Sequence, residues 1–387
     1  MTIVAALTLI LWIVSGVIAV LNLALLPRLR KVSPTVDAPM VSVIVPARNE
    51  ERSLGASLRA LLDQDYSSFE VILVDDQSTD DTRKIAGALA ARDERLRPVD
   101  GEPLPAGWLG KPWAHHQGVR HSRGDLLLFV DADVRLEPGT LSSAVAEIQQ
   151  STAGLLAVLP RVEMKGVWEH LLMPQLALAA FSFMPSWLAN HTRWSRMAIG
   201  GGAGILVRRS VYDAAGGHER LRDAVIDDVS LARRCAAVAP FRLVVADDFV
   251  SVRMYHGLGE IVAGFTKNFY YVLGANLISA ALILIGSAAL HLAPYVWSAE
   301  LIVALSTGRP PAVSSILGAI ALATILLTRA LIYGRFRYGM VNALLGHLPM
   351  VFVWSWIAIR STWIVGVRKR LGWRGRSYDA GIKRFGS

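Results

Sequence analysis

Long uncharged stretches flank a central region in which short apolar runs alternate with polar ones. The stretch from Ile3 to Leu26 contains no charged residue, and about 20 apolar residues are enough for a helix to cross a bilayer. A cleaved signal peptide is the alternative, but the stretch lacks a basic start, its apolar run is too long, and no clear small-residue cleavage site follows. The pattern therefore predicts a transmembrane anchor over residues 1–27 and a linker over residues 28–40.

The central region, from Met40 to about Met254, alternates between β-branched runs and helix-like stretches. The predicted strands are Val41–Val45, Val71–Val74, Leu126–Val130, Gly154–Leu159, Gly204–Arg208 and Phe241–Val245, and the helix-like stretches between them include Ser53–Leu62 and Thr82–Ala91. This alternation indicates an α/β fold with a largely parallel sheet. Ligands bind such sheets beyond the carboxyl ends of the strands, so the search for site residues begins there.

The chain becomes apolar again towards its C-terminus. Three segments are each long enough to span a bilayer: Val272–Ala293, Val313–Gly334 and Val341–Gly366. The piece Pro294–Ser306 is ambiguous, because it is short and contains Glu300. We therefore predict a C-terminal transmembrane region over residues 269–366, followed by a basic tail over residues 367–387.

Composition and charge extend this division. Hydrophobic residues make up 53% of the 387 positions, which fits a soluble domain joined to membrane segments. The formal net charge is +9, and the basic clusters lie beside apolar stretches: Arg28, Arg30 and Lys31; Arg335 and Arg337; and the tail from Arg368 to Arg384. Because this charge brackets apolar runs instead of lining one folded face, nucleic acid is not an expected partner.

The same charges predict an orientation. Lys and Arg beside membrane segments usually face the cytoplasm. We therefore expect a multi-pass protein of the cell membrane with its N-terminus outside and its α/β domain cytoplasmic. A cytoplasmic tail requires an even number of C-terminal crossings, so either Pro294–Ser306 also crosses or one of the three longer segments only dips in. The single cysteine, Cys235, fits a reducing compartment and is expected to be a buried filler.

Polar residues follow the first predicted strand in the stretch VSVIVPARNE, residues 41–50. The strand stops at Pro46, and Asn49 and Glu50 begin the next predicted helix. Pro46 and Glu50 are therefore candidates to border a ligand above the sheet. Ordinary helix capping is the alternative explanation.

The second polar cluster, VDDQSTD at residues 74–80, follows the next strand. Its carboxylates, Asp75 and Asp76, can accept hydrogen bonds from a base and a ribose, whereas a loop that binds only phosphate is typically Gly-rich or basic. Ser78 or Asp80 is expected to cap the helix that follows.

The third cluster is the pair Asp131 and Asp133, directly after the buried run Leu126–Val130. Two carboxylates with one residue between them point the same way from an extended backbone, and unpartnered they repel each other. A divalent cation removes this repulsion, and hard oxygen ligands suit Mg²⁺ or Mn²⁺, which can also hold a diphosphate. Surface aspartate pairs are common, but this position after a hydrophobic strand favours metal binding.

Asp227 and Asp228 begin a fourth cluster, on a helical stretch that ends near Ala237. Asp228 is a candidate general base for an acceptor hydroxyl; favourable charge at a helix N-terminus is the alternative. Lys111 is either a phosphate partner or a solvated loop lysine. His256 is either a further metal ligand or a structural histidine.

These four clusters, in this order, resemble the family 2 glycosyltransferases, which have the GT-A fold. The matching pieces are VSVIVPARNE, VDDQSTD, VDAD and IDDVSLARR, the last standing where the family usually has Glu-Asp-x-x-Leu. The resemblance covers roughly residues 40–270 and implies a GT-A domain over residues 41–268. Three further stretches, LPAGWLGKPWAHHQG, PRVEMKGVWEHLLMPQ and WRGRSY, look like the membrane branch that includes hopene-associated and carotenoid-type glycosyltransferases.

The resemblance implies a role for each matching position. Asp76 is expected to bind the base of a nucleotide-sugar, with a UDP-sugar as the expected donor. Asp131 and Asp133 are expected to hold the ribose–diphosphate and a Mg²⁺ or Mn²⁺ ion, with Asp133 the more direct ligand. Asp228 is expected to be the catalytic base of an inverting transfer, in which Lys111 helps to stabilise the leaving diphosphate.

The sequence departs from the family pattern at Gln77, usually Gly, and at Asp227, usually Glu; neither change removes a required oxygen ligand. The Q-x-x-R-W signature of processive polysaccharide synthases is absent from the sequence, which favours transfer of one or a few sugars.

The acceptor is the least determined part of this interpretation. Residues 167–188 are apolar and broken by Pro174 and Pro185; we read them as an interfacial helix that brings a lipid acceptor to the donor, with a buried core helix as the alternative. A non-lipid acceptor, or a nucleotide-sugar-binding membrane subunit without catalysis, are the competing functions. No obligate protein partner is evident.

Overall fold

The computed structural model describes residues 1–33, 38–373 and 376–379, with side chains up to residue 370. Residues 34–37 of the predicted linker and residues 374–375 and 380–387 of the predicted basic tail lie outside this description. The chain forms two compact units. Among the described residues, an α/β unit comprises Leu26–Glu163 and Ser186–Met254, and a helical unit comprises Met1–Leu25, Met164–Pro185 and the chain from Tyr255 to Asp379.

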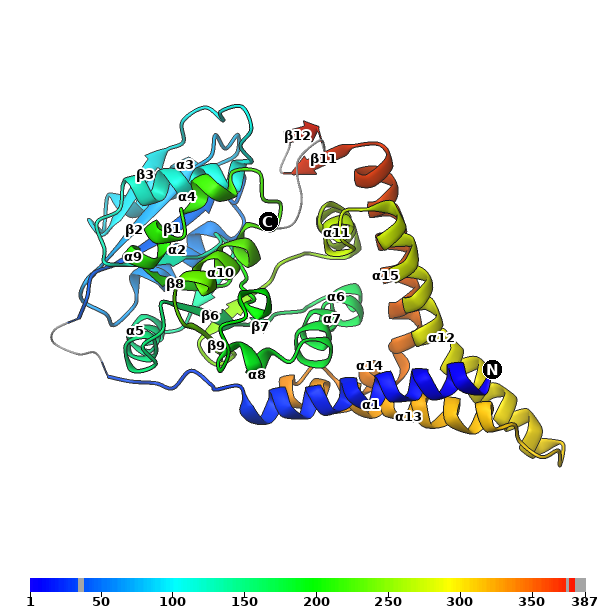
Figure 1. Cartoon of the computed structure of the whole chain (residues 1–387). Coiled ribbons are helices and arrows are strands. Elements are labelled where there is room, and N and C mark those ends of the chain that lie inside the picture. Colours follow the sequence, from blue (N-terminus) through cyan, green and yellow to red (C-terminus); the bar gives the residue numbers. More distant parts are fainter. Residues whose placement is uncertain (34–37, 374–375, 380–387) are drawn as a thin grey trace. The chain divides into compact units, whose positions relative to one another are not determined.

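A seven-stranded sheet forms the centre of the α/β unit, in the order β3-β2-β1-β4-β8-β6-β9 (Figure 1). Its strands are β1 (Val41–Ala47), β2 (Phe69–Asp75), β3 (Leu96–Asp100), β4 (Leu126–Phe129), β6 (Leu155–Leu159), β8 (Ile205–Arg208) and β9 (Phe241–Val245). All six predicted strands are present, while β3 was not predicted. Its alternating exposed residues, with Pro98 among them, place it at the sheet edge.

The predicted parallel arrangement holds for only part of this sheet. Strands β3, β2, β1 and β4 are mutually parallel, and β6 and β9 are parallel to each other. Between these groups, β8 pairs antiparallel with both β4 and β6. Four parallel strands therefore bring their carboxyl ends to one edge, which is where their polar loops meet.

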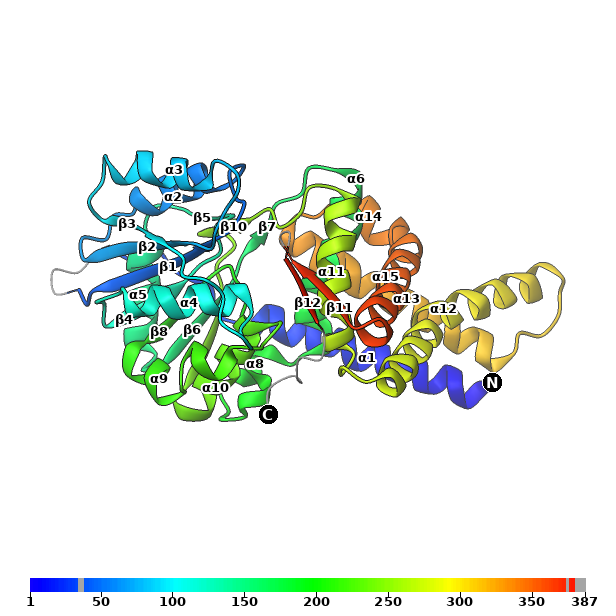
Figure 2. The same ribbon diagram turned by 90° about the horizontal axis from the view of Figure 1, so that it is seen from above.

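Helices cover both faces of the sheet, and Figure 2 shows α2 and α3 on one side and α4, α9 and α10 on the other. The helices of this unit are α2 (Leu54–Leu62), α3 (Thr82–Ala90), α4 (Gly110–Arg120), α5 (Thr140–Gln150), α8 (Ser186–Ala189), α9 (Arg209–Ala214) and α10 (Asp227–Val238), with short 3₁₀ turns η2 (Ser195–Met197) and η3 (His218–Leu221). Helices α2, α3 and α5 share one continuous core with the inward residues of β1, β2 and β4. Because these strands are buried on both faces, their sequences are continuous apolar runs.

A second, three-stranded sheet has the order β5-β10-β7, with β5 (Val134–Leu136), β7 (Arg161–Val162) and β10 (Val250–Val252). The start of the predicted linker also belongs to the fold. The Leu29 N–H donates to the carbonyl of Val245 at 2.8 Å, at the outer strand β9, and Arg28 forms ion pairs with Asp247 and Asp248. This contact covers part of an otherwise open sheet edge.

The helical unit contains long apolar helices. It comprises α1 (Thr2–Leu25), α6 (Val167–Leu172), α7 (Pro174–Leu178), the π-helix η1 (Ala179–Phe183), α11 (Leu258–Val272), α12 (Leu277–Ser306), α13 (Val313–Phe336), α14 (Met340–Leu345), α15 (His347–Ser361), the π-helix η4 (Thr362–Val367), and the hairpin β11 (Arg370–Trp373) and β12 (Arg376–Asp379). Among the described residues, four helical segments are long and apolar enough to cross a membrane: α1, α12, α13 and α15 with η4.

The ambiguous segment Pro294–Ser306 is the second half of α12 and forms no crossing of its own. Of the two arrangements considered above, the one in which this piece crosses separately is therefore wrong. Pro294 lies inside the helix, because a helical segment can accept a proline where neighbouring groups satisfy the freed backbone carbonyl. Pro294 has no N–H for the backbone carbonyl of Leu290, and this carbonyl accepts from the Trp12 Nε1–H at 3.0 Å instead.

The stretch predicted as one interfacial helix is a series of short segments. Helices α6 and α7 meet at Pro174, η1 follows, and the chain is extended at Met184 before α8 begins at Ser186. Val167 is 82% exposed and Trp168 is 42% exposed, whereas the middle of the stretch is buried. Apolar side chains thus face outward at its N-terminal end and again at Phe183, which is 45% exposed.

Candidate active site

The loops that follow β1 and β2 are joined by hydrogen bonds. The Asn49 N–H donates to the Ser78 hydroxyl at 3.0 Å, and the Thr79 N–H donates to the Asn49 side-chain oxygen at 2.8 Å. The Glu51 N–H donates to an Asp80 carboxylate oxygen at 3.1 Å. These polar residues therefore connect two loops. The predicted capping role falls to Asp80, whose Oδ1 accepts from the Thr82 N–H at 3.0 Å at the start of α3, whereas the Ser78 hydroxyl accepts from Asn49.

This loop structure explains the departure at Gln77. The φ angle of Gln77 is +57°, in the left-handed region that glycine adopts at little cost. Its N–H donates to the carbonyl of Asp75 at 2.8 Å, which closes a tight turn. The family's usual glycine at this position is thus a backbone requirement that Gln77 meets with some strain.

The predicted donor-site residues Pro46, Glu50 and Asp76 lie on these two loops. Pro46 is paired with Val74 at the ends of β1 and β2. The buried Asp76 donates its N–H to the carbonyl of Ala47 at 2.8 Å. Asp76 therefore stands at the carboxyl end of β2, at the same edge as Pro46 and Glu50.

Asp131 and Asp133 follow β4 at the neighbouring position of this edge. The expected extended backbone is wrong: Ala132 and Asp133 lie in a turn closed by the Val134 N–H and the Asp131 carbonyl, 3.2 Å apart. Ala132 is buried, whereas both aspartates are half-buried. The turn connects β4 in the large sheet to β5 in the three-stranded sheet, and both aspartates remain partly exposed at this edge.

Lys111 belongs to the first turn of α4, so a solvated loop lysine is the wrong reading. Its Nζ lies 2.8 Å from Asp131 Oδ1 and 3.8 Å from Asp227 Oδ1. Burial alone would lower the pKa of Lys111, but Asp131, Asp227 and Asp228 together raise it above its usual value. The lysine is therefore a fixed positive charge beside the aspartate pair.

Asp227 and Asp228 form the first turn of α10, and both line one small cavity with Lys111 and Asp131. Burial raises the pKa of Asp228 to about 6, against the opposing effect of Lys111. Burial would also raise the pKa of Asp227, but Lys111 and His115 hold it well below its usual value. The two neighbouring aspartates thus differ: Asp227 is a firmly ionised partner of Lys111, while Asp228 has the pKa of a base near neutral pH.

The chemistry around Asp131 and Asp133 fits a divalent cation. Burial, together with the charges of Asp131 and Glu50, raises the pKa of Asp133 to about 7, which is the response of carboxylates that lack a sufficient countercharge. Gly202 keeps the space beside Asp131 open, because a Cβ at that position would lie 1.9 Å from Asp131 Oδ2. Oxygen donors of this kind suit Mg²⁺ or Mn²⁺.

Two histidines of this region were not assigned a role from the sequence. His115 and His218 are buried and line the same cavity. Lys111 and His115 are four positions apart on a helix, which places both on one face of α4. This spacing is the sequence signal that could have identified His115 as a site residue. His218, in the 3₁₀ turn η3, has no such periodic signal.

Two further residues were predicted outside the main clusters. Cys235 is buried, and burial raises the pKa of its thiol to about 12, which confirms it as an inert filler. His256 belongs to the helical unit, where its Nδ1 lies 3.3 Å from Glu260 Oε2; its role as a metal ligand stays a prediction.

Comparisons with known proteins agree with this geometry. Residues 42–216 match the family described as Glycosyl transferase family 2. Two curated relatives are named 4,4'-diaponeurosporenoate glycosyltransferase. The one from Staphylococcus haemolyticus (strain JCSC1435) is 30% identical over 239 residues, and the one from Staphylococcus aureus (strain USA300) is 29% identical over 238 residues. Each match covers 59% of this chain and 60% of the relative's length.

A solved structure shows the fold. The mannosyltransferase PcManGT from Pyrobaculum calidifontis, in complex with GDP-Man and Mn²⁺, superposes with a TM-score of 0.53 and 21% sequence identity, covering 90% of this chain and 98% of that one. This likeness confirms the predicted GT-A fold with apolar helices at both ends of the chain. Residues 42–216 are thus similar to the family 2 glycosyltransferases, and the solved structure supports the fold alone.

Proposed function

We propose that the protein is a membrane-bound inverting glycosyltransferase that moves a sugar from a nucleotide-sugar donor to a lipid-type acceptor at the cytoplasmic face of the cell membrane. The observation that carries the proposal is the position of Asp228. It lines the same cavity as Lys111 and Asp131, so a candidate base and a candidate diphosphate site share one space. A binding subunit without catalysis would not require a carboxylate with a raised pKa at this point.

The donor side of the reaction uses the loops at the carboxyl edge of the sheet. Asp76 binds the base, Pro46 and Glu50 border the nucleotide, and Asp131 lies at the ribose–diphosphate. A Mg²⁺ or Mn²⁺ ion held by Asp131 and Asp133 would supply Lewis-acid stabilisation of the diphosphate. The donor is a UDP-sugar in this proposal. The solved neighbour carries GDP-Man and Mn²⁺, so a GDP-sugar is the first alternative to test.

The transfer step requires one proton acceptor and one countercharge. Asp228 accepts the proton of the acceptor hydroxyl while the hydroxyl oxygen bonds to the anomeric carbon. The bond from that carbon to the diphosphate oxygen breaks on the opposite face, which inverts the configuration. Lys111 stabilises the negative charge that grows on the leaving diphosphate, and this requires it to exchange its contact with Asp131 for one with phosphate.

The acceptor is proposed from the membrane character of the chain and from its relatives. The curated relatives are named for a carotenoid acid, 4,4'-diaponeurosporenoate, and this chain has four helical segments able to span a membrane among its described residues. The exposed Val167 and Trp168 are consistent with a segment that lies at the membrane surface.

With the α/β unit and the tail both on the cytoplasmic side, the number of membrane crossings between them must be even. Three candidate spans follow the α/β unit, and an odd number of full crossings would put the tail outside. We therefore propose that one of α12, α13 and α15 with η4 only dips into the membrane. Cysteine labelling of introduced sites at 308 and 369 from each side of sealed vesicles tests this arrangement.

The enzyme assignment is tested in membranes from cells that express the full chain. Radiolabelled UDP-sugars and GDP-sugars are added with Mn²⁺, and the lipid extract is analysed by mass spectrometry. We expect a lipid that gains one or a few sugars, and loss of that product in Asp228→Asn. If membranes bind the donor but form no glycosylated product with any extract, the binding-subunit function replaces this one.

A further inference from the structure

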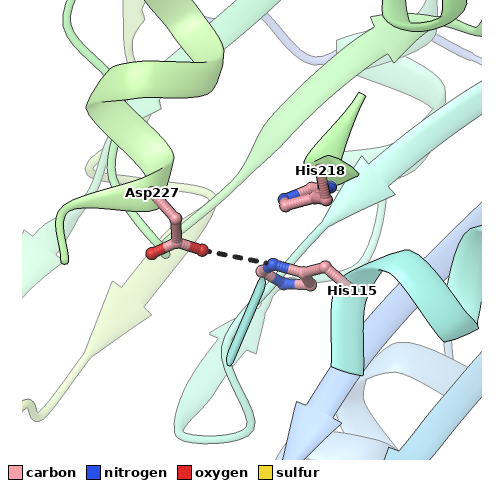
Figure 3. A group of neighbouring side chains, drawn as sticks. All are labelled: His115, His218 and Asp227. Carbon is pink, nitrogen blue, oxygen red and sulfur yellow. Dashed lines mark ion pairs between the residues drawn. The ribbon is translucent and has the colours of Figure 1, made fainter. Parts of the chain in front are cut away.

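A buried cluster next to the candidate donor site has no role in the proposed transfer. It consists of His115 from α4, His218 from η3 and Asp227 from the first turn of α10. Figure 3 shows the imidazole of His115 directed at the carboxylate of Asp227, with the ring of His218 beside it. All three side chains are buried, and each comes from a different segment of the wall around the cavity.

The spacing of the three side chains resembles a metal ligand set. One ligand atom from each residue lies within 4.8 Å of the others. The His115 Nδ1 and the Asp227 Oδ2 are 3.3 Å apart. In a tetrahedral site with metal–ligand bonds of about 2.0–2.1 Å, two ligand atoms are about 3.3–3.4 Å apart. The His115–Asp227 pair therefore already has the separation of two ligands on one tetrahedral ion.

The hydrogen bonding of the cluster also points to a missing partner. Within the described part of the chain, neither ring nitrogen of His115 makes a well-formed hydrogen bond, and Asp227 Oδ2 accepts none. Leaving a buried polar group without a partner is destabilising, and more so for a charged group. Two of these atoms, His115 Nδ1 and Asp227 Oδ2, face each other, so a single bound ion would satisfy both.

The neighbouring groups orient the ligands as metal sites require. His218 Nδ1 contacts the Tyr212 hydroxyl at 2.9 Å, which leaves Nε2 as the free ligand atom. A second hydrogen bond of this type commonly fixes the ring of a metal-binding histidine. Asp227 divides its oxygens, because Oδ1 faces Lys111 at 3.8 Å while Oδ2 faces His115. The lysine thus lies on the opposite oxygen from the proposed ion.

We propose that His115, His218 and Asp227 form a transition-metal site for Zn²⁺ or an ion of similar ligand preference, separate from Asp131 and Asp133. Two imidazoles and one carboxylate are borderline ligands that suit Zn²⁺, whereas the all-carboxylate pair suits Mg²⁺ or Mn²⁺. The ion ties α4, η3 and α10 together. It thereby fixes the helix starts that carry Lys111 and Asp228.

The test measures metal content and therefore does not depend on glycosyl transfer. Full-length protein purified in detergent is stripped with a chelator, dialysed against Zn²⁺ and analysed by mass spectrometry of the metal. Asp133→Asn removes one carboxylate of the other site. We expect about one Zn²⁺ per chain in both the parent and Asp133→Asn, and at least about tenfold weaker binding in His115→Gln and His218→Gln.

Two variants keep the result interpretable. His116→Gln changes the adjacent histidine, whose ring stacks on Trp113 outside the cluster, and should leave Zn²⁺ binding unchanged. His115→Cys replaces one zinc ligand by another and should retain binding, with the altered visible absorption of bound Co²⁺ reporting the new sulfur ligand. If no Zn²⁺ remains bound, or if His115→Gln binds it as well as the parent, the metal site is excluded and the cluster is only a buried contact.

Discussion

Two buried polar clusters, one in each unit, differ in how their groups are partnered. In the helical unit, Arg329 donates to the backbone carbonyls of Asn342 and Ala343 and to the hydroxyl of Tyr333. In the α/β unit, Lys111 shares a cavity with Asp131, Asp227 and Asp228, and His115 lacks a well-formed hydrogen bond within the described residues.

The difference separates a structural cluster from a functional one. The carbonyls that Arg329 contacts belong to the short helix α14, so the arginine supplies donors near a helix end, where the Asn342 carbonyl also accepts from the Gly346 N–H at 3.1 Å. The α/β cavity instead gathers three carboxylates around one ammonium group, an excess of negative charge that the chain itself does not balance. Unbalanced charge of this kind is typical of a site that binds a cation or reacts.

The largest effect is expected for the base. Asp228→Asn should lower the turnover rate of sugar transfer by about 10²–10⁴-fold, because an amide cannot accept the proton of the acceptor hydroxyl. Donor affinity should change little. Product formation and donor binding are measured on the same membrane preparation, and Asp213→Asn, an exposed aspartate on α9, is the matched control. Equal activity in the two variants would assign Asp228 a structural role.

A pair of adjacent glycines tests the space beside Asp131. In Gly202→Ala the new methyl group would lie 1.9 Å from Asp131 Oδ2, whereas nothing lies within 4 Å of a Cβ at Gly201. A displacement of Asp131 should lower activity by about 10²-fold in Gly202→Ala, and Gly201→Ala should behave as the parent. The transfer rates of both variants are measured. Equal rates in Gly202→Ala and Gly201→Ala would show that the space beside Asp131 is unimportant for transfer.

The structural cluster should respond in stability and not in donor binding. Arg329→Met removes the side-chain donor to the carbonyl of Ala343, while the carbonyl of Asn342 keeps its bond from the Gly346 N–H. The loss at Ala343 should lower the free energy of unfolding by about 1–3 kcal/mol. Arg360→Met, at an exposed arginine of α15, should have a much smaller effect. Thermal unfolding in detergent and donor titration are the two readouts. If Arg329→Met instead lost donor affinity without losing stability, the Arg329 cluster would be functional and not structural.

The smallest effect is expected for Cys235, two turns beyond Asp228 on α10. Cys235→Ala should cost roughly 1 kcal/mol of stability, as is usual for a buried truncation, and leave the transfer rate unchanged. Treatment of the parent with a thiol reagent should likewise leave the activity intact, because the thiol is buried. Inactivation by the reagent would show that Cys235 belongs to the reactive site.

The sequence predicts six of the seven strands of the central sheet, because these six are largely buried and read as apolar runs, whereas the partly exposed β3 does not. It also places Asp76, Asp131 and Asp228 at the ends of the elements where the structure has them. The antiparallel direction of β8 was not predicted, because it depends on pairing with β4 and β6 and not on the residues of β8 itself.

The remaining features depend on contacts between distant segments. The pairing of Lys111 with Asp131 and the approach of His115 to Asp227 join residues that are 20 and 112 positions apart in the numbering. The turn at Asp131–Val134 follows from the position of β5 in a second sheet. Local sequence rules do not contain this information, because Asp131, Ala132 and Asp133 alone do not determine whether the chain turns or continues as a strand.

The most direct test of the account is Mn²⁺-dependent donor binding at the carboxylate edge of the sheet. A labelled nucleotide-sugar is titrated into the full-length protein in detergent, with and without Mn²⁺, for the parent, Asp133→Asn and Asp228→Asn. The account predicts that Mn²⁺ strengthens donor binding in the parent and in Asp228→Asn, and that Asp133→Asn loses this increase. Donor binding that is the same in all three proteins, with or without Mn²⁺, would contradict it.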